Sequence, residues 1–147
     1  MDYTILKTEL TTDPKGVGYS QPLAATNDNA VAALLNATTG PGALTLTIQT
    51  YTKEQFLTGI MPAIEALGTA TAALQAKYQP ILQVTLSVST ILYAVAQPIL
   101  TSLISDGLLT QAEVTAFTTR QGSSMERLYG AGTVAAWTDV AKAMGRM

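Results

Sequence analysis

The sequence predicts a mostly α-helical fold with one extended strand or arm at about residues 43–50. Three capping boxes, each a Thr or Ser followed three positions later by Gln or Glu, mark helix starts at Thr52, Thr110 and Ser123. Strict alternation of apolar and polar residues over Leu44–Gln49 predicts the strand. These patterns indicate helices arranged around a core, together with one strand that needs a second strand as its pairing partner.

The chain length predicts a single domain. Its 147 residues are enough to bury a sizeable core. Within that domain we expect N-terminal helices and a loop over residues 1–42, the extended arm over 43–51, and a helical core over 52–147.

The N-terminal part is expected to hold two short helices. The first covers residues 2–10 and must end before Pro14, which cannot donate a helical hydrogen bond. Asn27 is a favourable N-cap for the second, over residues 28–36. Between them, Tyr19 is expected to anchor the chain to the core.

The rest of the chain is expected to be a series of helices. Pro80 is expected to open a long helix that ends at Asp106-Gly107, a favourable C-terminal stop. The other expected helices cover residues 53–60, 62–67, 69–77, 111–119, 124–129 and 138–144.

The long helix contains a segment without charge. No charged residue occurs from Tyr78 to Ser105, a length that could span a bilayer. Its polar residues and a stripe of apolar residues at helical spacing favour a buried amphipathic helix over a membrane span. The stripe consists of Val84, Val88, Ile91, Leu92, Val95, Ile99 and Leu103.

The predicted strand needs a pairing partner, because a lone strand leaves backbone groups unpaired. One option is the alternating run 82–88 of the same chain, and the other is a neighbouring subunit. The second option makes the apolar residues of the arm candidates for interface contacts. Trp137, the only Trp, could be a core anchor or an interface anchor. The interface candidates are therefore Leu44, Leu46, Ile48 and Trp137.

The composition argues against an enzyme. The chain has no His and no Cys, which excludes a Ser–His–Asp triad, a cysteine nucleophile and thiolate or imidazole metal ligands. The ten acidic residues are scattered, and half of them are explained by positions near helix starts. The turn Gly130-Ala131-Gly132-Thr133 lacks the rest of a phosphate-binding motif. We therefore expect no cofactor and no metal.

The charge content predicts protein partners. Only 12% of residues are charged, against about a quarter in ordinary soluble domains. A surface poor in charge is poorly protected against association, so we expect contacts with further copies of the chain. The eight basic residues form no patch, which argues against nucleic acid. The first residues show no signal-peptide pattern, so synthesis in the cytoplasm is expected.

Two stretches of the chain resemble a group of small proteins encoded among the structural genes of tailed bacteriophages. The first stretch is Tyr3-Thr4-x-Leu6-Lys7-Thr8-Glu9-x-Thr11-Thr12-Asp13-Pro14-x-Gly16-x-Gly18-Tyr19, followed by Asp28-x-x-Val31-Ala32-x-Leu34-Leu35-Asn36. The second is Ser123-x-x-Glu126-x-Leu128-x-Gly130-x-Gly132-x-Val134 with Asp139-Val140-Ala141-Lys142-Ala143. Together they cover both ends of the chain, somewhat under half of it.

The resemblance implies a virion or morphogenesis protein rather than an enzyme. It assigns no functional residues and leaves the place in the particle open between neck, tail and capsid. The implied location is the virion, after synthesis in the host cytoplasm, with copies of the chain and other phage structural proteins as partners. A head–tail neck or connector, a tail protein, a capsid decoration protein and a membrane-active protein using residues 78–105 all remain candidates.

Overall fold

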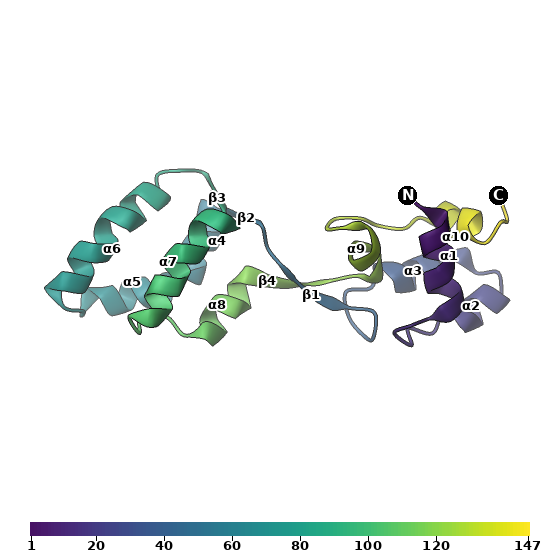
Figure 1. Cartoon of the computed structure of the whole chain (residues 1–147), viewed down its shortest axis with the longest axis horizontal. Helices are drawn as coiled ribbons and strands as arrows, with labels where there is room; N and C mark the ends of the chain where they lie inside the picture. The colour runs from purple at the N-terminus through teal and green to yellow at the C-terminus, as the bar shows by residue number, and fades with distance from the viewer. The chain divides into compact units, whose positions relative to one another are not determined.

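The computed structural model describes residues 1–147 and confirms the mostly helical fold: the chain is 59% helical, with two small antiparallel sheets of two strands each (Figure 1). The helices are α1 (Tyr3–Thr12), α2 (Ser20–Ala24), α3 (Asp28–Asn36), α4 (Lys53–Gly59), α5 (Met61–Gly68), α6 (Ala72–Thr85), α7 (Tyr93–Ser105), α8 (Gln111–Thr118), α9 (Ser124–Tyr129) and α10 (Trp137–Ala143). The strands are β1 (Leu44–Thr47), β2 (Thr50–Thr52), β3 (Thr90–Leu92) and β4 (Thr119–Gly122).

The chain forms two compact units, each with its own hydrophobic cluster. Unit 1 contains Met1–Leu46 and Gln121–Met147, and unit 2 contains Thr47–Arg120. The chain leaves unit 1 within β1 and returns to it within β4. Residues 121–147, which the sequence pattern groups with the helical core over 52–147, pack instead with the N-terminal residues. That the chain folds cooperatively as a single domain stays a prediction.

Unit 1 is built from α1, α2, α3, α9 and α10. Asn27 caps α3 as predicted, its side-chain oxygen accepting from the Ala30 amide at 3.1 Å. Tyr19 is fully buried, also as predicted. The short helix α2, which directly follows Tyr19, was not predicted. The cluster of unit 1 is formed chiefly by Leu6, Leu10, Tyr19, Val31, Leu35, Met125 and Val140.

The first helix of unit 2, α4, starts with a capping box. The Thr52 hydroxyl accepts from the Gln55 amide, and the Gln55 side chain accepts from the Thr52 amide, which fixes the start of α4. The boxes at Thr110 and Ser123 are formed as well and begin α8 and α9. All three predicted helix starts are therefore confirmed.

The predicted long helix over residues 80–105 is wrong. Pro80 lies inside α6, the chain turns after Thr85, and β3 intervenes before α7 begins at Tyr93. The reason is the pairing of β3 with β2, in which Ile91 lies opposite Tyr51. The β-branched residues Thr90 and Ile91 suit this extended conformation.

The predicted apolar stripe does not form one buried face. Ile91 and Leu103 are buried, but Val84, Val88, Leu92 and Val95 are 71%, 47%, 55% and 57% exposed. No helix is long and apolar enough to cross a membrane.

The arm pairs within the chain. β1 forms a sheet with β4, a partner that the sequence pattern did not suggest, and the Gln121 side chain donates to the Thr45 hydroxyl at 3.4 Å. The run 82–88 is not available as a strand, because its first residues complete α6.

Replacing Leu6 by Ala tests whether each unit depends on its own cluster. Leu6 is fully buried in unit 1, so the substitution is expected to reduce the stability of that unit by about 2–5 kcal/mol. Hydrogen exchange followed by mass spectrometry should show faster exchange in α1, α3 and α10 than in unit 2. Ile5→Ala, at an exposed position on the same helix, is the matched control and should change stability by about 0.5 kcal/mol or less. Equal loss of protection in both units would show instead that the chain unfolds as one cooperative domain.

Candidate functional site

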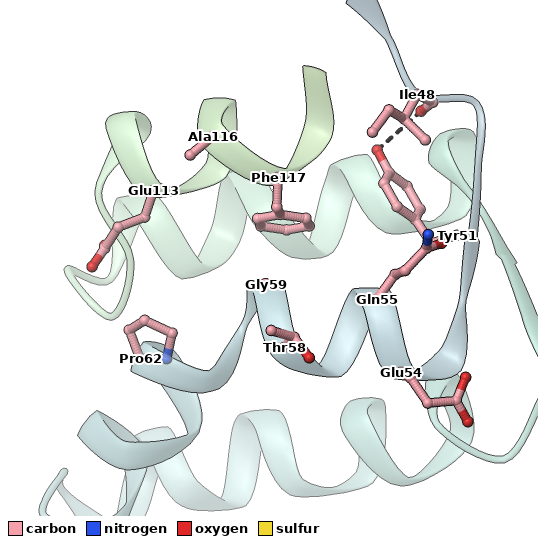
Figure 2. Close-up of a pocket in the computed structure, with 10 residues that line it drawn as sticks. All are labelled: Ile48, Tyr51, Glu54, Gln55, Thr58, Gly59, Pro62, Glu113, Ala116 and Phe117. Carbon is pink, nitrogen blue, oxygen red and sulfur yellow. Dashed lines mark hydrogen bonds between the residues drawn. The ribbon is translucent and has the colours of Figure 1, made fainter. Parts of the chain in front are cut away.

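A groove lies on unit 2 between α4 and α8 (Figure 2). It has a volume of about 610 Å³, and its walls combine aromatic, aliphatic and a few polar side chains. Its lining residues are Ile48, Tyr51, Glu54, Gln55, Thr58, Gly59, Pro62, Glu113, Ala116 and Phe117.

The floor of the groove depends on a close approach between Gly59 and Phe117. The Phe117 ring lies against α4 so closely that a Cβ at position 59 would overlap it (Figure 2). The ring also packs edge-on against Tyr51 and Phe56, with centroid distances of 6.1 and 6.3 Å. The three aromatic rings, which come from β2, α4 and α8, therefore hold these elements together.

Tyr51 supplies a fixed wall rather than a reactive group. Its hydroxyl donates to the backbone carbonyl of Ile48 at 3.0 Å (Figure 2). Burial, with a smaller contribution from the nearby Tyr93, raises the pKa of Tyr51 to about 12. The phenol therefore stays protonated at neutral pH.

The two carboxylates of the groove do not form an acid–base pair. The Glu113 carboxylate accepts hydrogen bonds from the backbone amide and the hydroxyl of Thr110 at 2.7 and 2.8 Å. The hydrogen bond from the backbone amide is the main cause of the lowered pKa of Glu113. Glu54 is exposed and lies at the opposite end of the groove (Figure 2). The groove is therefore suited to apolar contact, not to proton transfer.

A charged cluster elsewhere in unit 2 has a structural role. Asp106, at the end of α7, accepts from the Lys77 ammonium at 2.6 Å and from the Tyr78 hydroxyl at 2.5 Å. The hydrogen bond from Lys77 is the main cause of the lowered pKa of Asp106. These contacts tie α6 to the C-terminal end of α7.

In unit 1, two acidic side chains hold loops in place. Asp13 accepts from the amides of Val17 and Gly18 at 2.7 and 2.8 Å, which closes the turn after α1. Glu126 accepts from the Ser123 amide and also from the Gly132 amide, so it fixes both ends of α9.

The buried Glu9 of unit 1 is paired. Its carboxylate accepts from the Arg127 guanidinium at 2.5 Å, and the Glu9 side chain is 3% exposed. This ion pair joins α1, which contains Glu9, to α9, which contains Arg127. Removing one partner would leave a buried charge without compensation.

The four interface candidates have different surroundings. Leu46 lies so close to Gly122 that a Cβ at position 122 would overlap the Leu46 side chain. Ile48 packs on the hydrophobic cluster of unit 2. Leu44 is half-buried. Trp137 begins α10 and is 48% exposed, so it is no core anchor. Their role as interface residues stays a prediction.

The most unusual surface feature is one that the sequence pattern assigned to the core. Residues 84–95, which we name the 84–95 segment, expose the side chains of Val84, Val88, Leu92 and Val95. The segment has no charge that would keep a neighbouring molecule away. The sequence carries a signal for this surface, the absence of charge from Tyr78 to Ser105, but the helical spacing of its apolar residues favours burial inside the chain.

Neither the protein-family models, nor the curated proteins, nor the solved structures that we searched contain a match to this chain.

Substitution of Gly59 tests the construction of the groove. We expect Gly59→Ala to force the Phe117 ring away from α4 and to lower the free energy of unfolding by about 1–3 kcal/mol. Urea denaturation followed by far-UV circular dichroism measures the change. Gly68→Ala is the matched control, since this helical glycine has open space around its Cβ position and gains helix propensity instead. Equal stability of the two variants would contradict the packing described.

Proposed function

We propose that this protein is a structural component of a tailed bacteriophage particle, a multi-copy head–tail neck, connector or tail protein that acts by self-assembly. The observation that carries the proposal is the 84–95 segment, which exposes four large apolar side chains without a charged residue among them. Exposed apolar surface of this kind is typical of protein–protein contact sites. A protein that repeats one contact around an axis can close into a ring.

The resemblance to phage structural proteins supports the proposal. Both resembling stretches lie in unit 1, where Asp13, Glu126 and the Glu9–Arg127 pair stabilise their loops and helices. The exposed segment lies in unit 2. We infer that unit 1 is the part shared with such proteins and that unit 2 adds contact surface specific to this chain.

The groove between α4 and α8 is consistent with the same role. Its aromatic floor offers an apolar surface, and its two carboxylates are separated along its length. An apolar side chain of a neighbouring subunit is the kind of group that such a groove accommodates. In the alternative role of a capsid decoration protein, the same surfaces would contact the major capsid protein.

The copy number in purified particles tests the proposal. We expect quantitative mass spectrometry of particles of the phage that encodes this chain to find it at about six or twelve copies per particle, as closed rings of subunits require. The major capsid protein is the internal standard, and residual host proteins report contamination. Hundreds of copies would favour the decoration protein or a tail-tube component. Absence from the particle would contradict the proposal.

A further inference from the structure

The outer edge of β3 is a second unusual feature of the 84–95 segment. β3 belongs to a sheet of two strands, with β2 as its neighbour on one side. Across that pair, Tyr93 donates to the Gln49 carbonyl at 2.9 Å and Lys53 donates to the Ser89 carbonyl at 3.1 Å. Hydrogen-bonded pairs alternate along an antiparallel ladder, so Ile91 is the next residue that faces β2.

The alternation places the backbone groups of Thr90 on the opposite edge. The N–H and C=O of Thr90 and the N–H of Leu92 point away from β2, and no strand lies on that side. The side chains of both residues are exposed. An open edge of this kind is a template for pairing with another extended segment.

We propose that the occupant of this edge is β3 of a second copy of the chain, which pairs with it in antiparallel orientation about a two-fold axis near Ile91. The two ribbons then form one sheet of four strands, and Thr90 of each copy lies opposite Leu92 of the other. The inference rests on the proposed function, because it names one contact between copies. A two-fold contact closes at two copies, so a ring of about six or twelve copies also needs a second, heterologous contact.

The distribution of charge favours a second copy over a charged partner. No charged residue occurs from Tyr78 to Ser105, so a charged partner would lose hydration of its charges without gaining an opposite charge. A second copy brings the same uncharged surface. Residues 84–95 of the two copies therefore have no ionic group to bury and no charge to repel each other.

The exposed apolar side chains support the same arrangement. Leu92 stands on β3, and Val95 follows it by three positions, on the same side of the first turn of α7. Burying these side chains against the same segment of the other copy removes apolar surface from water on both copies. The backbone edge supplies the direction of pairing, and the apolar side chains supply most of the attraction.

Sedimentation velocity of the purified full chain over a dilution series tests the inference. We expect a reversible monomer–dimer equilibrium.

Two substitutions in β3 are expected to weaken the dimer. Leu92→Lys brings two positive charges near the two-fold axis, and Thr90→Pro removes an outward N–H while leaving the ladder to β2 intact. Each substitution is expected to raise the dimer Kd at least about tenfold. The matched control is Val134→Lys, at an exposed valine of unit 1, which should leave the equilibrium unchanged.

A spin label gives a second readout that does not depend on weakening the contact. The chain has no Cys, so Thr90→Cys carries a nitroxide at one site only. Pulsed dipolar spectroscopy should detect strong coupling between labels of two copies at position 90, and this coupling should disappear when the labelled chain is diluted with an excess of unlabelled chain. Circular dichroism confirms that each variant is folded.

Three results would overturn the inference: a wild-type chain that stays monomeric at every concentration, Leu92→Lys and Thr90→Pro variants that dimerise like wild type, or a dimer without coupling between labels at position 90. None of these results changes the copy number in the particle. A chain that is present in the particle but monomeric when pure refutes the β3 contact alone, whereas a chain that dimerises but is absent from the particle refutes the proposed function.

Discussion

The pairing of β2 with β3 is the interaction on which the account of unit 2 depends. It joins Tyr51 to Ile91, two buried residues that the chain separates by three complete helices, α4, α5 and α6. Because these residues pair, residues 86–92 cannot continue the helix that precedes them. The same pairing sets the positions at which α4 and α7 begin, since each helix directly follows one of the two strands.

The pairing also decides which side chains meet water. Alternation along a strand places Ile91 inside, against the cluster of unit 2, and turns Thr90 and Leu92 outward. Tyr51, buried on the other strand, forms the wall of the groove and packs on Phe117. The groove and the exposed 84–95 segment therefore have one origin. Because the protein has few charges, the pairing of β2 with β3 leaves an apolar surface exposed to neighbouring molecules.

The sequence predicted the features that are determined locally. The three capping boxes, the Asn27 cap and the end of α7 before Asp106-Gly107 all depend on residues within about one turn of each other, and all are formed. The same holds for α1, where burial of Leu6 and Leu10 follows their spacing.

The features that depend on distant pairing were missed. The stripe from Val84 to Leu103 fits a helical period, and nothing near it in the sequence shows that Tyr51 will pair with Ile91. The partner of β1 was missed for a similar reason, because Thr119-Arg120-Gln121-Gly122 is too polar and short to stand out as a strand. The groove was not foreseen either, since its residues come from distant segments and meet only because Gly59 admits the Phe117 ring. Of the interface candidates, Trp137 is exposed, whereas Ile48 is partly used by the chain itself.

The measurement that tests the central claim most directly is a nuclear Overhauser spectrum of the isotope-labelled chain. Thr50 with Leu92, and Thr52 with Thr90, are the non-hydrogen-bonded pairs of the ladder. The Cα atoms of such a pair lie about 4.5 Å apart. The account predicts strong Hα–Hα cross-peaks for both pairs. Helical cross-peaks between residues three positions apart, continuous from residue 80 to residue 105, would contradict it. They would mean that the uncharged segment is one helix after all, with no strand edge and no exposed 84–95 segment.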